Sequence, residues 1–221
     1  MSTAHHTSSV TGLHSNIELA VAAASRVSST ALQAGMRAPL FALADAEGKE
    51  ITLEALLDAG PVVLNFFRGA WCSYGARSLA DFSAVAEELA ALGASAVTIG
   101  PSIQALQRST SAAAITELYD VDMEVARTYG LTFNLPSSLR QLYRQLGYQP
   151  PNNSDMADSW LVPVPAMYLV NRDGVIVLAS VELDYRKRFG AASLLGALKA
   201  ISPAKRQRRV QISTCHRDCR T

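Results

Sequence analysis

The chain has 221 residues, of which 49% are hydrophobic and 18% charged, a balance typical of a globular protein. Its formal net charge of +1 gives no overall basic field for nucleic acid, and no segment approaches the roughly 20 apolar residues that span a bilayer. Only three cysteines occur, Cys72, Cys215 and Cys219, which are too few for a disulfide scaffold and are typical of a reducing compartment. We therefore expect a cytoplasmic protein with no membrane or nucleic-acid partner.

The chain divides into three predicted segments. Residues 1–34 are rich in Ala, Ser, Thr and His, and we expect a flexible leader with a short helix over residues 16–27. Residues 35–202 form the folded domain. Residues 203–221 have no hydrophobic periodicity and are predicted to be a disordered basic tail, in which Lys205–Arg209 is either a solvated stretch or an address for nuclear entry.

Within the domain, short apolar runs rich in β-formers alternate with segments of helical periodicity. The expected strands are residues 41–43, 61–67, 94–99, 115–118, 164–170 and 175–180, and the expected helices are residues 52–57, 73–92, 122–129, 137–146 and 191–201. Thr52 is the expected N-cap of the first of these helices. Residues 132–163 form a helical insertion. This order favours an α/β fold, a three-layer sandwich with a central mixed β-sheet.

The most informative motif follows the strand at residues 61–67, where Trp71-Cys72 stands at the expected start of a helix. The N-terminus of a helix carries partial positive charge and free backbone N–H groups, which favour a thiolate over a thiol. Arg68 and Arg77 are candidates for further positive charge nearby. Cys72 is therefore the candidate nucleophile for attack on a peroxide or a disulfide. The alternative is an inert buried cysteine. Trp71 is expected to cover the sulfur or to be a plain core residue, and both roles can hold together.

Five stretches of the chain, taken together, resemble one known family. They are Gly35–Pro39 leading into Phe41, Gly60–Gly69 before Trp71-Cys72, Glu124–Arg127 with Tyr129–Leu131, Leu161–Pro165, and Asn171–Gly174. In this order and spacing they resemble the peroxiredoxin-like proteins of the alkyl hydroperoxide reductase/thiol-specific antioxidant superfamily, which have a thioredoxin-like fold. The resemblance implies an antioxidant oxidoreductase that reduces hydroperoxides. It also implies no bound cofactor and an external thiol, either glutathione or a thioredoxin-like protein, as the reductant.

Two departures from the family pattern affect the implied mechanism. Members of this subgroup usually carry Trp-Cys-x-x-Cys, and peroxiredoxins place their peroxide-reactive cysteine at the second position, which is Gly75 here. Peroxiredoxins also place an arginine before the late strand, where this chain has Val164-Pro165-Ala166. Pro165 instead resembles the cis-proline of thioredoxins, which abuts the reactive cysteine. The resemblance thus implies Cys72 as the catalytic residue, with Trp71, Arg68 and Pro165 as substrate-binding residues.

Without a cysteine at position 75, an oxidised Cys72 needs another thiol, which is a small thiol, a protein partner, or Cys215 or Cys219 of the tail. The rival hypothesis is a non-catalytic thioredoxin-fold binding protein, or an accessory protein of a specialised pathway, with a degenerate active site. Cys215, His216 and Cys219 fall short of a four-ligand zinc set, so no metal site is predicted. A homodimer formed through edge pairing of the sheet stays open.

Overall fold

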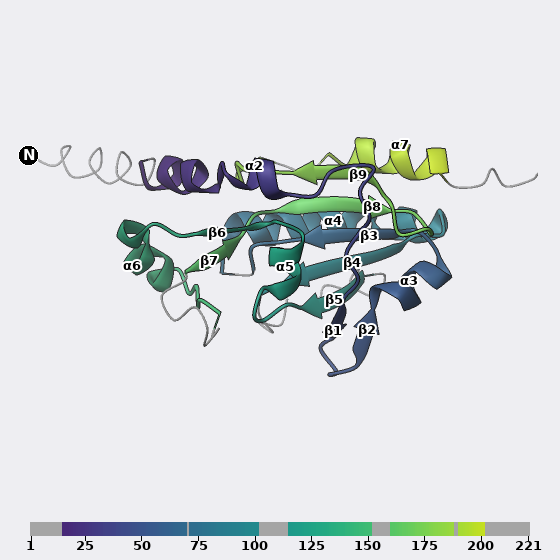
Figure 1. The fold of residues 1–221 in the computed structure, drawn as a ribbon, viewed down its shortest axis with the longest axis horizontal. Coiled ribbons are helices and arrows are strands. Elements are labelled where there is room, and N and C mark those ends of the chain that lie inside the picture. Colours follow the sequence, from purple (N-terminus) through teal and green to yellow (C-terminus); the bar gives the residue numbers. More distant parts are fainter. Residues whose placement is uncertain (1–14, 70, 102–114, 152–159, 188–189, 202–221) are drawn as a thin grey trace, which may run out of the picture.

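The computed structural model describes residues 15–69, 71–101, 115–151, 160–187 and 190–201 (Figure 1). A helix at residues 15–24 precedes the named elements. These are α2 (Val27–Thr30), β1 (Ala42–Ala44), β2 (Glu50–Thr52), α3 (Leu53–Ala59), β3 (Val62–Phe66), α4 (Ser73–Ala91), β4 (Ser95–Gly100), β5 (Ile115–Tyr119), α5 (Glu124–Thr128), β6 (Thr132–Asn134), α6 (Ser137–Gln145), β7 (Leu161–Pro163), β8 (Ala166–Val170), β9 (Ile176–Val181) and α7 (Ala191–Ile201). The strands and helices predicted within the domain all form, whereas β2, β6 and β7 were not predicted. The predicted tail lies outside the described residues.

The main sheet has seven strands in the order β2-β1-β5-β4-β3-β8-β9. β3 pairs in parallel with β4, and β4 with β5, whereas β8 runs antiparallel to both β3 and β9. β3 is therefore an interior strand. β6 and β7 form a separate antiparallel pair at the two ends of the insertion. The predicted α/β class with a central mixed sheet is confirmed.

Two apolar clusters cover the two faces of the sheet, and β3 contributes to both. Val62, Leu64 and Phe66 belong to the first cluster, which also holds residues of α3 and α5. Val63 belongs to the second cluster, with residues of α4 and α7. Successive strand residues point to opposite faces, so this strand, apolar except for Asn65, is covered on both sides. Figure 1 shows α4 behind the central strands and α5 in front of them, which is the predicted three-layer arrangement.

The described part of the leader packs against the domain instead of being loosely attached. Its buried face consists of small apolar side chains that belong to the first cluster and are each at most 5% exposed: Ala20, Ala24, Val27 and Ala31. Leu32 N–H also donates to the Tyr129 carbonyl at 3.2 Å. The expectation of a flexible segment does not hold for residues 15–34, because alanines at helical spacing let this helix approach the core closely.

The pairing of β3 with β8 positions the candidate residues. Phe66 is paired with Ala166 in this antiparallel ladder. Residues that follow Phe66 therefore lie beside residues that precede Ala166, which brings Arg68 towards Pro165. The chain then enters α4 at Ser73, directly after Cys72.

Candidate active site

Cys72 is the N-cap residue of α4, at the end of the loop that leaves β3. Its backbone is extended, its N–H donates to the Gly69 carbonyl at 3.2 Å, and its carbonyl accepts from Ala76 N–H at 3.0 Å. No acidic residue lies in the first turn of this 19-residue helix. Cys72 therefore sits at the positive end of a long helix, as predicted, and that position favours negative charge.

The Cys72 side chain is buried, with 7% of the residue exposed, but it belongs to neither of the two core clusters. Its sulfur accepts no capping hydrogen bond from the α4 amides. The free N–H groups that the sequence analysis invoked are therefore not bonded to the sulfur. The helix field, rather than a specific amide hydrogen bond, is thus what the start of α4 offers to a negative charge at this position.

Arg68 is a buried cation directly after β3, only 2% exposed. Its Nη2 donates to Tyr143 Oη at 3.0 Å, and its Nε has no hydrogen-bond partner. Its guanidinium carbon lies 4.0 Å from the centre of the Tyr185 ring and 5.3 Å from that of Trp71, within the range of cation–π attraction. Ion pairs between described residues do not include Arg68. Aromatic faces and one neutral hydroxyl thus surround its charge.

The rings around this cation also pack against one another. The centre of the Trp71 ring lies 5.3 Å from that of Tyr143 and 5.0 Å from that of Tyr148. Tyr185 packs edge-on against Tyr74, with ring centres 5.6 Å apart. Trp71 is half-buried and packs on the first core cluster. It is therefore a core residue that also covers the guanidinium.

Two of these tyrosines carry hydroxyl groups with perturbed acidity. Burial raises the pKa of Tyr185 well above its usual value; Tyr143 and Cys72 add to the rise, and Arg68 opposes it. Burial also raises the pKa of Tyr148, again against the effect of Arg68. Both hydroxyls are consequently protonated at neutral pH, and that of Tyr148 donates a hydrogen bond to the Leu161 carbonyl.

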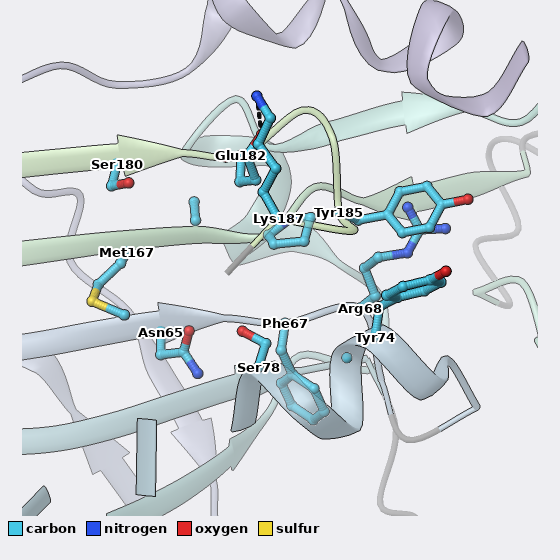
Figure 2. Close-up of a pocket in the computed structure, with 13 residues that line it drawn as sticks. Asn65, Phe67, Arg68, Tyr74, Ser78, Met167, Ser180, Glu182, Tyr185 and Lys187 are labelled. Carbon is cyan, nitrogen blue, oxygen red and sulfur yellow. Dashed lines mark ion pairs between the residues drawn. The ribbon is translucent and has the colours of Figure 1, made fainter. Parts of the chain in front are cut away.

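A pocket of about 40 Å³ lies beside Cys72, between α4, β8 and the segment that follows β9 (Figure 2). Arg68 and Pro165 line it, as does Gly75, whereas Cys72 and Trp71 do not. The other polar side chains of the lining are Asn65, Tyr74, Ser78, Ser180, Glu182, Tyr185 and Lys187. The structure therefore brings two of the four predicted site residues to a common space, and it places the other two next to that space.

Pro165 lines the pocket but does not have the predicted backbone conformation. No peptide bond between described residues is cis, so the likeness to the thioredoxin cis-proline is wrong in this respect. The Pro165 carbonyl accepts from Glu182 N–H at 2.9 Å, and Val164 N–H donates to the Leu131 carbonyl at 2.7 Å. These two bonds anchor the chain as it passes from β7 into β8.

Gly75 lies in the first turn of α4, where the backbone of the preceding loop approaches closely. A Cβ atom at this position would be 2.7 Å from the Gly69 carbonyl oxygen and 3.6 Å from the Cys72 Cβ. Ordinary van der Waals contacts of a Cβ begin at 3.4 Å. The second cysteine of the related motif therefore has no room here unless the loop moves.

Sequence reasoning missed the tyrosines that surround Arg68. On α6, Leu139 and Tyr143 are the buried residues, and their four-residue spacing was a readable signal that Tyr143 shares the buried face. Tyr185 follows β9 in an irregular segment, and no periodic pattern there indicates that it reaches Arg68.

The described residues contain no group of three or more His, Cys, Asp or Glu side chains arranged to hold a metal ion. Among the helices found in the same residues, none has the length and apolar character needed to cross a membrane. Cys215, His216 and Cys219, considered above as soft metal ligands, lie outside the described residues.

Solved structures with a similar fold include three bacterial proteins. Peroxidoxin BcpB from Mycobacterium tuberculosis superposes with a TM-score of 0.56 at 22% identity, covering 77% of this chain and 98% of that one. Thiol peroxidase from Chromobacterium violaceum gives 0.58 at 15% identity, with 77% and 87% covered. Peroxiredoxin Q from Xanthomonas campestris gives 0.52 at 18% identity, with 77% and 99% covered. At these identities the likeness establishes the thioredoxin-like fold of peroxiredoxins.

The family follows from the sequence. No curated protein gives a significant match to the chain. The model of the AhpC/TSA family, however, matches residues 34–179, which run from before β1 into β9 and include Arg68, Cys72 and Pro165. Because that match covers most of the chain and agrees with the fold, the protein belongs to the AhpC/TSA family.

Proposed function

We propose that this protein is a thiol-dependent peroxidase in which Cys72 is the single reacting cysteine. The family and the fold support thiol-dependent peroxide reduction as the class of chemistry. The observation that carries the assignment to Cys72 is its place at the N-terminus of α4, directly after Trp71, whose ring centre lies 5.3 Å from the Arg68 guanidinium carbon. The helix terminus and Arg68 supply positive charge where an anionic sulfur would form.

In the first step, the Cys72 thiolate attacks the terminal oxygen of a hydroperoxide. A sulfur–oxygen bond forms and the oxygen–oxygen bond breaks. The sulfur is oxidised to a sulfenic acid, and the peroxide leaves as an alkoxide that takes up a proton to become an alcohol. The Tyr185 hydroxyl, which burial keeps protonated, is the candidate hydrogen-bond donor to this alkoxide.

In the second step, an external thiol attacks the sulfenic sulfur of Cys72. A mixed disulfide forms and water leaves; a second thiol then releases the Cys72 thiol and departs as a disulfide. The two external thiols supply the two electrons that the peroxide consumed. The motif supplies no second thiol of its own, because Gly75 takes the place of the second cysteine and the backbone leaves no space for one. The thiol that attacks Cys72 must therefore come from outside the motif.

The test is direct trapping of the oxidised sulfur. Reduced protein is treated with hydrogen peroxide, cumene hydroperoxide or oxidised glutathione in the presence of dimedone, and the modified residue is located by mass spectrometry. We expect a dimedone adduct on Cys72 with the peroxides, and catalytic peroxide consumption once glutathione or a thioredoxin is added. A variant with Cys215→Ser and Cys219→Ser should behave like the wild type, and Cys72→Ser should lose all turnover.

The burial of Cys72 favours the rival hypothesis, a non-catalytic binding protein with the same fold. With 7% of the residue exposed and no contact with the pocket, its sulfur depends on motion of its surroundings to meet a peroxide. Folded protein that shows no sulfenic acid at Cys72 at any peroxide concentration would support the rival hypothesis and exclude the peroxidase assignment. Full peroxide consumption by Cys72→Ser would exclude Cys72 as the nucleophile.

A further inference from the structure

Arg68 has no counter-charge within the described residues, although only 2% of the residue is exposed. A buried charge is costly unless it is paired and fully hydrogen-bonded. One neutral hydrogen bond, to Tyr143, and the faces of three rings compensate it in part, and Nε has no partner. The described residues therefore leave this guanidinium open to a partner of opposite charge.

The pocket that Arg68 lines has the size and the charge for such a partner. Since a water needs roughly 10–15 Å³ of cavity, a volume of about 40 Å³ holds about three waters, which is the size of one small head group. Lys187 adds a second cation to the lining, and Asn65 and Ser78 add further polar groups (Figure 2). The pocket is thus rich in donors on the side of α4 and of Arg68.

One carboxylate, Glu182, also lines the pocket, and it already has partners. Its Oε1 accepts from Asp184 N–H at 3.0 Å and pairs with Lys187 Nζ at 3.8 Å. No hydrogen bond or ion pair among the described residues joins Glu182 to Arg68, so within them the arginine is still without a counter-charge. The lining of the pocket carries two cations and one carboxylate, so one further anionic group would balance its charge.

We propose that this pocket binds the carboxylate of the small molecule that reacts at Cys72, with the Arg68 guanidinium as its anchor. The molecule is either a hydroperoxide or a thiol reductant that carries a carboxylate. A bidentate or single-ended ion pair of a carboxylate with a guanidinium is the strongest match for this donor set. The reacting part of this assignment rests on the proposed function; carboxylate binding itself does not.

Binding is measured first, with a protein that cannot react. Folded Cys72→Ser protein is titrated with sodium propionate and, separately, with propionamide, which has the same shape and no charge, and amide shifts are followed by nuclear magnetic resonance. We expect saturable shifts around residues 65–78 with propionate and at least tenfold weaker binding of propionamide. Equal binding of the two, or no saturable binding of propionate, would overturn the assignment.

Variants then locate the anchor. Arg68→Gln should reduce propionate affinity at least tenfold, and Lys187→Gln, which removes an exposed cation, should reduce it by a smaller factor. Lys49→Gln is the matched control, because it removes the same charge from an exposed turn beside β2, at the opposite edge of the sheet from β9. If Arg68→Gln does not fold, the comparison of propionate with propionamide and the Lys187→Gln variant still decide the question.

Reaction rates distinguish the two sources of the carboxylate. Linoleic acid hydroperoxide is compared with its methyl ester as the oxidant, and mercaptopropionate with mercaptoethanol as the reductant, after correction for the thiolate fraction of each. A preference of fivefold or more for the acid in one comparison, lost in Arg68→Gln, identifies that molecule. Propionate binding without any Cys72 oxidation would support the anion site and refute the peroxidase assignment. Cys72 oxidation without propionate binding would support the peroxidase assignment and refute the anion site.

Discussion

Replacing Gly75 with alanine adds one methyl group at the point where α4 approaches the preceding loop. In an open helix, alanine is about 1 kcal/mol more favourable than glycine. At position 75 the new Cβ would lie 2.7 Å from the Gly69 carbonyl oxygen, so the loop must retreat by about 0.7 Å to reach the ordinary 3.4 Å contact. Overpacking of this kind costs about 1–3 kcal/mol. The strain should therefore offset or exceed the gain in helix propensity.

Gly196→Ala provides the matched control. Gly196 lies exposed within α7, and a Cβ there would meet no atom within 4 Å. Both variants gain helix propensity, so the difference between their free energies of unfolding isolates the contact with Gly69. We expect Gly75→Ala to be less stable than Gly196→Ala by about 1–3 kcal/mol in urea denaturation followed by circular dichroism. Equal stability of the two variants would refute the steric argument, and with it the claim that Gly75→Cys requires the loop to move.

Three further changes test other parts of the structure. Tyr143→Phe removes the hydrogen bond to the buried Arg68 guanidinium and should cost about 1.5–3 kcal/mol in urea denaturation, whereas a change below about 0.5 kcal/mol would show that this bond contributes little. Burial raises the pKa of Asp120 above 3.8, although the amides of α5 oppose the rise. The stabilisation linked to the protonated carboxyl is therefore present below about pH 4 and lost as pH rises through the folded-state pKa. Asp120→Asn should lack that loss, and parallel stability profiles of the wild type and the variant between pH 3 and pH 7 would contradict this expectation. Ala24→Asp places a charge in the packed part of the leader and should cost about 3–5 kcal/mol in the same assay, while Ala22→Asp, on the exposed side of that helix, should stay within about 0.5 kcal/mol of wild type.

Local sequence signals predicted the elements that carry the site. Thr52 was the expected N-cap of a helix, and its Oγ1 accepts from Ala55 N–H at 3.2 Å. The apolar run of β3 is buried at all five residues, as a strand covered on both faces should be. The place of Cys72 at the start of α4 follows from the same pattern, because strand, loop and helix are consecutive in the chain.

The environment of Cys72 could not be predicted in this way. Tyr143 and Tyr185 stand 71 and 113 residues after Cys72 in the chain, and both reach the guanidinium of Arg68 through tertiary packing. The cis conformation of Pro165 was predicted by analogy and was wrong, and the hydrogen bonds that anchor the chain there join it to two segments far away in the sequence. The leader was expected to be loose from its composition, yet Ala20, Ala24 and Ala31 are buried.

The amino-acid sequence by itself determined the alternation of strands and helices, the family, and the cysteine at the head of the long helix, since each depends on residues that are neighbours in the chain. Only the tertiary structure decided that Arg68 is buried among aromatic rings with no ion pair to a described carboxylate, and that position 75 has no room for a side chain. Charge compensation and close backbone approach are properties of segments far apart in sequence, and the composition of any one segment does not encode them.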